Sequence, residues 1–201
     1  MSQTPSQLRP ALIWVALLSL GGCQPLHAER ALPSNTTRWV LSPSAIASLS
    51  SAHDAQGVPE RICFGDPFGP SALYLKFPSG WNARGRAVKA FLTLTPSDAA
   101  ASDASTISVT AWRVRSDWQP GELRTWSDKP ELAPPFASRA ITSAPPRELR
   151  IDVTELARFA AENPERDFGI ALVSRGGAGR GAPFATGMAG GVAPRLEVYV
   201  H

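Results

Sequence analysis

The chain has 201 residues, of which 43% are hydrophobic and 18% are charged, a composition that suits one globular domain. Its 20 basic and 17 acidic side chains give a net charge of +3 without a dense basic stripe, which argues against nucleic acid as a partner. Three His and two Cys leave little material for a metal centre or for acid–base catalysis.

The first 22 residues have the features of a signal peptide. Arg9 precedes the apolar run 11–20, which is shorter than the ~20 residues that a membrane-spanning helix needs. The segment Leu20-Gly21-Gly22-Cys23 then resembles the lipobox of bacterial lipoproteins. The resemblance implies lipidation of Cys23 and a stable membrane anchor, and Gln24 implies an outer-membrane destination. The alternative is an ordinary secretory signal that is cut elsewhere.

Residues 23–44 mix Pro, Ser, Thr and Asn with little periodicity, and we expect a flexible tether that leads to a domain over residues 45–201. If Cys23 is lipidated, Cys63 has no partner for a disulfide within the chain. We therefore expect Cys63 to be a small buried thiol.

Several short segments of the domain alternate hydrophobic and polar residues, as half-buried strands do. The segments are 73–77, 88–94, 107–111, 149–153, 168–172 and 196–200. Breakers separate them, among them Pro134-Pro135 and the Gly-rich stretch 176–191. One short helix is predicted from Thr154, its expected N-cap, to Asn163-Pro164. The pattern predicts an all-β fold, an antiparallel β-sandwich with one short helix.

Taken in order, several blocks resemble the DNRLRE-type (disaggregatase-related) domain, a family grouped with jelly-roll carbohydrate-binding modules. The blocks are 73–77, 90–94, 109–114, 125–130, 151–154, 168–172 and 193–200. The turn at Phe184-Ala185-Thr186-Gly187-Met188 lacks two charges that the family usually has there, and the first strand, expected near Ile46, is faint. The resemblance implies a jelly-roll-like sandwich that binds cell-surface or extracellular polysaccharide without catalysis.

Tryptophans interleaved with arginines are candidates for a sugar-binding surface, because sugar rings stack on aromatic rings and Arg pairs with hydroxyls or carboxylates. The candidates are Trp81, Trp112, Arg113, Arg115, Trp118 and Trp126. Trp118 and Trp126 have the alternative role of fixing a long loop to the core. Trp81, in a turn, is the best candidate for an exposed ring. One exposed patch with Trp81 and Trp112 would favour binding of an acidic polysaccharide. Burial of these rings would favour the alternative, a structural or protein-docking module without a sugar site.

Enzymatic motifs such as His-Glu-x-x-His, Gly-x-Ser-x-Gly and Cys-x-x-Cys do not occur in the sequence, and we predict no catalytic residues. Jelly-roll sugar binders often hold a structural calcium ion through loop carboxylates, for which Asp54 and Asp66 are the conceivable ligands. No other metal or cofactor is expected. The predicted partners are a membrane, through the lipid anchor, and a polysaccharide.

Overall fold

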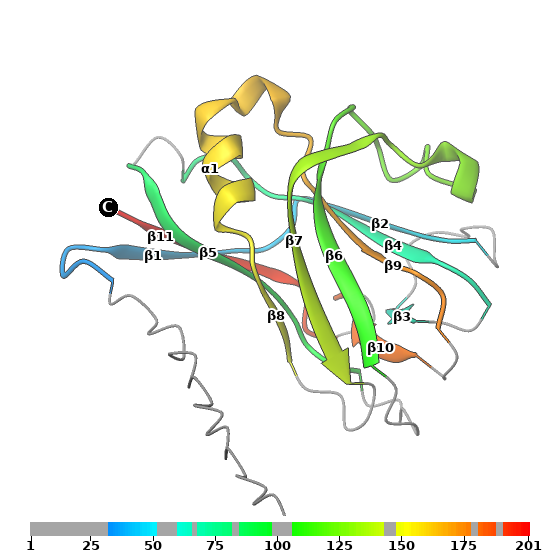
Figure 1. The fold of residues 1–201 in the computed structure, drawn as a ribbon. Coiled ribbons are helices and arrows are strands. Elements are labelled where there is room, and N and C mark those ends of the chain that lie inside the picture. Colours follow the sequence, from blue (N-terminus) through cyan, green and yellow to red (C-terminus); the bar gives the residue numbers. More distant parts are fainter. Residues whose placement is uncertain are drawn as a thin grey trace, which may run out of the picture. The chain divides into compact units, whose positions relative to one another are not determined.

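Two antiparallel sheets face each other across an apolar core in the computed structural model (Figure 1). The structure describes residues 32–51, 60–65, 68–81, 85–97, 106–142, 148–177, 181–187 and 191–201. These residues form the all-β antiparallel sandwich with one α-helix that the alternation predicts. The predicted signal peptide, Cys23, Asp54 and Asp66 lie outside the described residues.

The four-stranded sheet has the order β1-β11-β5-β8, so the first and last described strands are neighbours. Its strands are β1 (Thr37–Leu41), β11 (Arg195–Val200), β5 (Ala87–Leu94) and β8 (Leu149–Asp152). The five-stranded sheet has the order β2-β4-β9-β6-β7. Its strands are β2 (Ala45–Ser50), β4 (Ser71–Lys76), β9 (Ile170–Ser174), β6 (Thr106–Val114) and β7 (Leu132–Thr142).

The core between the sheets is made by the residues that the two-residue period places on one face of each strand. Leu92 and Val198 come from the four-stranded sheet, and Leu75, Val109 and Leu172 from the five-stranded sheet. All five side chains are fully buried. Burial of each such side chain contributes about 1.5–3 kcal/mol, so this core supplies most of the stabilisation of the fold.

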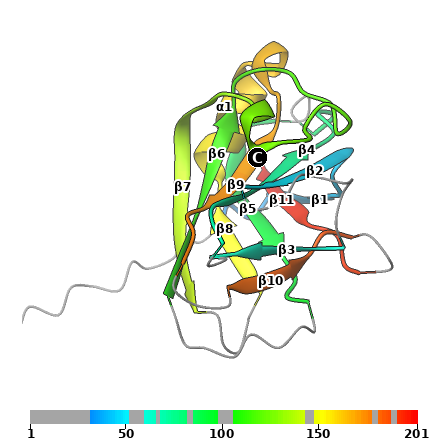
Figure 2. The ribbon, with the colours of Figure 1, turned by 90° about the vertical axis from the view of Figure 1, so that its right-hand side faces the viewer.

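A two-stranded sheet of β3 (Arg61–Phe64) and β10 (Ala182–Ala185) lies at one end of the sandwich (Figure 2). The rings of Phe64 and Phe184, one from each strand, pack with their centroids 5.8 Å apart and are buried. Cys63, expected to be buried, lies half-buried in β3. The small sheet thus extends the apolar core beyond the two large sheets.

Helix α1 (Thr154–Glu162) packs against β5 and β7 and inserts Leu156 and Ala157 into the core. It begins and ends as predicted, but Thr154 is not its N-cap. Val153 is the N-cap, and Thr154 is the first helical residue. The carboxylate of Asp152 accepts hydrogen bonds from the Thr154 backbone N–H and hydroxyl, and Thr154 Oγ1 accepts one from the Ala90 N–H. Two short 3₁₀ segments, η2 (Trp126–Asp128) and η3 (Pro164–Arg166), complete the helical structure described.

Three predictions about where strands begin and end need correction. Residues 37–41, expected in the tether over 23–44, form β1 and pair with β11, so the folded unit begins before residue 45. Pro134-Pro135, expected to separate strands, lies inside β7. Proline is tolerated there because β7 is an edge strand whose register with β6 shifts at this point. Trp112 pairs with Phe136 and Arg113 with Ala133, so the two prolines have no partner in the ladder. The strand β10 likewise lies within the Gly-rich stretch expected to be a loop.

No helix in the described part of the chain combines the length and the hydropathy needed to span a bilayer.

Candidate functional site

One half of the outer face of the five-stranded sheet is covered by the loop that follows β6. Trp118 of this loop is buried, its ring centroid lies 5.9 Å from that of Tyr74, and its Nε1–H donates to the Phe168 carbonyl over 2.8 Å. Leu123 joins the same apolar cluster. The predicted alternative for Trp118 is therefore confirmed, because its ring fixes the loop to the sheet.

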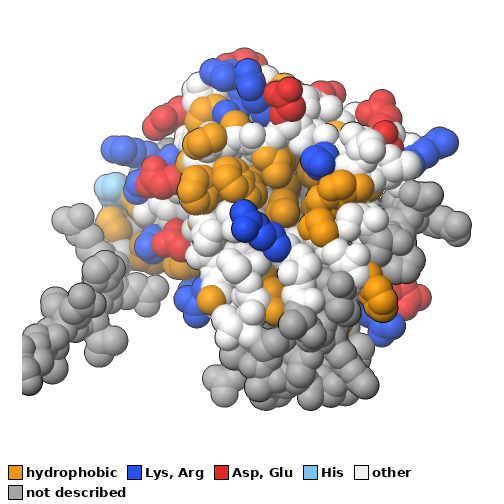
Figure 3. Space-filling view, turned by 45° about the vertical axis from the view of Figure 1, so that its right-hand side comes forward, with side chains coloured by type: hydrophobic (Ala, Val, Ile, Leu, Met, Phe, Trp, Pro, Cys, Tyr) orange, Lys and Arg blue, Asp and Glu red, His pale blue; other side chains and the backbone are white. Residues whose placement is uncertain are grey.

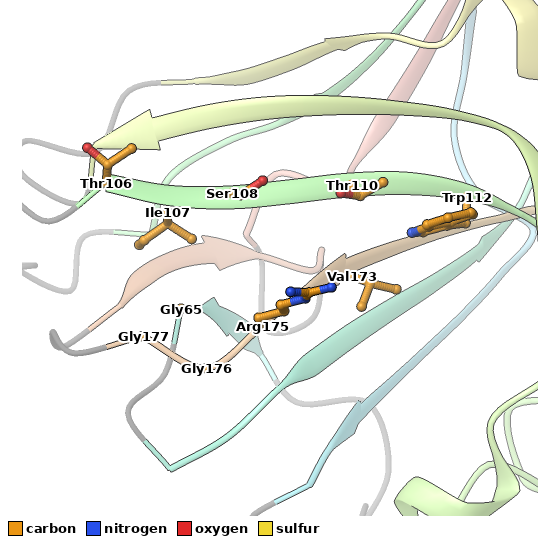
Figure 4. Close-up of a pocket in the computed structure, with 10 residues that line it drawn as sticks. All are labelled: Gly65, Thr106, Ile107, Ser108, Thr110, Trp112, Val173, Arg175, Gly176 and Gly177. Carbon is orange, nitrogen blue, oxygen red and sulfur yellow. The ribbon is translucent and has the colours of Figure 1, made fainter.

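The other half of this face is an open groove with a volume of about 450 Å³ (Figure 4). It is lined by Gly65, Thr106, Ile107, Ser108, Thr110, Trp112, Val173, Arg175, Gly176 and Gly177. Since Thr110 pairs with Val173 across the β6–β9 ladder, the floor of the groove consists of the outward-facing residues of two central strands. The volume lies in the range of about 300–1,000 Å³ that small-molecule sites occupy.

Trp112 and Phe136 form an aromatic pair on this face. The two residues are directly opposite in the β6–β7 ladder, and their ring centroids are 4.5 Å apart with an interplanar angle of 31°. Trp112 is half-buried, whereas Phe136 is 55% exposed. Figure 3 shows hydrophobic side chains gathered in a band across this side of the molecule, with basic groups beside it. An exposed aromatic pair offers an apolar platform for a ligand ring.

Hydroxyl groups continue the groove from the aromatic pair. Thr110 Oγ1 and Ser138 Oγ lie 2.9 Å apart in one hydrogen bond, and the exposed Ser108 follows on the same face of β6. A hydroxyl can donate and accept at once, so Thr110 and Ser138 retain capacity to bind a ligand after bonding to each other. The face therefore combines an apolar platform with polar groups that can select an orientation.

Trp81 and Arg113, predicted to bind a ligand, lie away from this groove. The indole of Trp81 is buried, which contradicts the prediction of an exposed ring. Both residues line a cavity of about 20 Å³ beneath α1, which has room for about one water molecule and not for a sugar. Arg113 donates to the Pro134 carbonyl, and its guanidinium lies 4.1 Å from the Phe159 ring centroid. These two side chains fix α1 and the start of β7 to β6.

Arg115 and Trp126 also lie elsewhere. Arg115 is exposed and pairs with Glu131, with its Nη1 3.3 Å from the carboxylate. Trp126 is half-buried against the cluster beneath the loop, where Lys129 Nζ lies 5.0 Å from its ring centroid. The six predicted residues therefore lie in different parts of the structure, and only Trp112 lines the groove.

Phe136 and Arg175 belong to this face but were not among the predicted residues. Phe136 follows Pro134-Pro135 in β7, and this strand was not predicted because the two prolines are strand breakers. Arg175 comes two residues after Val173, so extending the alternation past the end of β9 would have placed both side chains on one face. The signal for Arg175 was therefore present in the sequence.

The described carboxylates that titrate abnormally lie outside the groove. Burial raises the pKa of Asp167, whose carboxylate accepts one hydrogen bond from the Gly169 N–H. The hydrogen bond from Lys76 Nζ lowers the pKa of Asp117, with further help from the Trp118 N–H. Burial also raises the pKa of Tyr74 to about 12. These groups have structural partners around the loop and α1.

Within the described residues, no group of three or more His, Cys, Asp or Glu side chains is arranged to hold a metal ion. The expected calcium ligands, Asp54 and Asp66, are not among those residues. The chain matches no family model and no curated protein sequence. The function of the chain must therefore be inferred from its fold and from the groove.

Proposed function

We propose that the chain is a lipid-anchored protein of the bacterial cell envelope whose sandwich binds a polysaccharide in the groove without cleaving it. The anchor is the lipidated Cys23 at the end of the signal peptide. The ligand is a polysaccharide of the cell surface or of the extracellular matrix. The resemblance of the blocks between residues 73 and 200 to the DNRLRE-type domain supports the same class of ligand.

The exposed aromatic pair of Trp112 and Phe136 is the observation that carries this proposal. Sugar rings present apolar C–H faces, which pack on aromatic rings, while their hydroxyls bond to polar side chains nearby. The pair lies beside the hydroxyls of Thr110 and Ser138, so both kinds of contact are available on one face. A polysaccharide can lie along the strands because the residues that line the groove follow one another along β6 from Thr106 to Trp112 (Figure 4).

Binding without cleavage is supported by the residues of the groove. Glycoside hydrolysis generally uses two carboxylates that flank the scissile bond. The described lining consists of Gly, Thr, Ser, Ile, Val, Trp and Arg. These residues can hold and orient a sugar, whereas proton transfer to a glycosidic oxygen needs an acid.

The proposal is tested by affinity electrophoresis of the full-length protein, extracted in a neutral detergent, in gels that contain neutral or acidic polysaccharides. We expect retardation of the wild type and a loss of about 10-fold in affinity for Trp112→Ala, because removal of a central aromatic residue typically costs more than about 1 kcal/mol. Trp126→Ala is the matched control, since Trp126 lies outside the groove. Thermal melts show whether each variant is folded.

A second candidate is a structural or protein-docking module without a sugar site. Burial of Trp81 and Trp118 favours it, because those rings stabilise the fold and do not enlarge the aromatic surface. Folded wild-type protein that is not retarded by any polysaccharide would support this candidate. Loss of retardation for Trp126→Ala but not for Trp112→Ala would instead move the sugar site away from the groove.

A further inference from the structure

Arg175 places a positive charge in the groove, between Thr106 at one end and Trp112 at the other (Figure 4). It follows β9 by one residue and shares the outward direction of Val173, two residues earlier. Figure 4 shows its side chain lying along the sheet face toward Val173 and Trp112. Val173 pairs with Thr110, and Ala171 pairs with Trp112. Since every second residue shares a face, Arg175 lies on the same face as Ala171, four residues further along the chain. At ~3.3 Å per residue, about 13 Å of backbone separates Arg175 from Ala171, the residue opposite Trp112.

Among the residues that the structure describes, no carboxylate forms an ion pair with the Arg175 guanidinium. Among the described residues, the cations in ion pairs with carboxylates are Arg38, Lys76, Lys89, Arg115, Arg150, Arg158 and Arg195. None of these pairs includes Arg175, and the described lining of the groove has no carboxylate. The described part of the groove therefore has a net positive charge.

Small residues keep the space beside Arg175 open. Gly176 and Gly177 follow it directly, and both line the groove. A Cβ on Gly177 would come within 2.7 Å of the Gly65 carbonyl oxygen, so a larger residue would push these segments apart. The exposed Ser108 lies across from them on β6 and can donate to an anion. The charge is thus accessible and has a hydroxyl near it.

We infer that the ligand is an acidic polysaccharide whose carboxylate pairs with Arg175 while a sugar ring of the same chain packs on Trp112. This inference rests on the proposed function. The planar guanidinium presents two parallel N–H donors, which match the two oxygens of a carboxylate. The separation of Arg175 from Trp112 along the face suits linked sugars of one chain, so the charge selects the chemistry of the chain and the aromatic ring adds affinity.

The experiment compares each polyuronate with its own carboxyl-reduced product. Alginate, polygalacturonate and hyaluronan are used in affinity electrophoresis with the full-length protein in a neutral detergent. We expect the wild type to bind at least one native polymer about 10-fold more tightly than its reduced form, a typical gain from a charge-assisted hydrogen bond. Arg175→Ala should lose this preference. Arg86→Ala removes the same charge from the exposed residue directly before β5, a strand of the other sheet, so it should keep the preference.

Each other result overturns the inference in a recognisable way. Equal binding of native and reduced polymers, with Trp112→Ala still defective, would retain the sugar site but exclude recognition of a carboxylate. Equal losses for Arg175→Ala and Arg86→Ala would indicate attraction to overall charge. If no polymer, native or reduced, retards the folded wild type, the proposed function fails together with this inference.

Discussion

Trp118 and Trp112 lie on the same face of the five-stranded sheet but contact different surroundings. The indole of Trp118 is enclosed by Tyr74 and the cluster around it, with its Nε1–H bonded to the Phe168 carbonyl. Trp112 has Phe136 on one side and the open groove on the other. Two tryptophans separated by six positions in the chain therefore have separate roles, one in stability and one in the proposed binding.

Replacement of Trp118 tests its structural role. Trp118→Ala should lower the free energy of unfolding by about 3–5 kcal/mol, because it leaves a cavity in the outer cluster and an unpaired Phe168 carbonyl. Urea denaturation monitored by circular dichroism measures the change. Trp112→Ala is the control and should cost less, since its ring is only half-buried. Equal costs for the two variants would contradict the division of roles.

Asp167 should make stability depend on pH in the opposite sense to a salt-bridged carboxylate. Burial raises its pKa above the ordinary value of 3.8, so the folded state binds the proton more tightly than the unfolded chain does. Its contribution is therefore present at acidic pH and is lost as pH rises through the raised pKa. Asp167→Asn keeps an acceptor for the Gly169 N–H but does not titrate.

We expect Asp167→Asn to be more stable than the wild type near pH 7 and the two proteins to converge toward pH 3. Urea denaturation at several pH values measures the difference in the free energy of unfolding between the two proteins. The effects of the carboxylates that both proteins contain cancel in this difference. A difference that is constant with pH would show that Asp167 is not destabilised by its burial.

At the scale of elements, β1 shows why the folded unit cannot begin at residue 45. The strand pairs with β11 over the whole of Thr37–Leu41, and Trp39 and Leu41 pack against the core from it. Arg38 on the opposite face bonds to Glu197, with 2.7 Å between Nη2 and Oε1. Without β1, strand β11 would become an unprotected edge with apolar residues exposed beside it.

A variant that begins at residue 45 should therefore be less stable than one that begins at residue 32. Loss of the partly buried Trp39 and Leu41 is expected to lower the free energy of unfolding by about 2 kcal/mol or more. Thermal unfolding of the two variants measures the difference. Identical melting temperatures would indicate that residues 37–41 do not stabilise the domain and belong to the tether.

The molecule as a whole combines a proposed anchor at Cys23 with a groove on the outer face of one sheet. We predict that metabolic labelling with an alkyne palmitate tags the wild type and that Cys23→Ala loses the label and leaves the membrane fraction, because acyl chains supply the membrane affinity. Cys63→Ala is the matched control and should remain labelled. Equal labelling of the wild type and Cys23→Ala would exclude the anchor.

Local alternation by itself determined the fold class and the positions of β4, β5, β6, β8, β9 and β11, because a half-buried strand must alternate whatever the rest of the chain does. The helix was predicted from its start and stop residues, Thr154 and Asn163-Pro164. Alternation did not reveal β7, since Pro134-Pro135 is a breaker in a central strand and is acceptable only at an edge or a bulge. The position of a strand within its sheet is a property of the whole fold.

The candidate site was decided by tertiary structure for the same reason. Alternation placed Trp112 on the face opposite Val109 and Ala111, but it could not show whether that face is covered or open. The loop after β6 covers the part over Tyr74 and leaves the part over Val173 open. Whether an aromatic ring can contact a ligand depends on which segments cover it. That is decided by contacts between segments far apart in the chain.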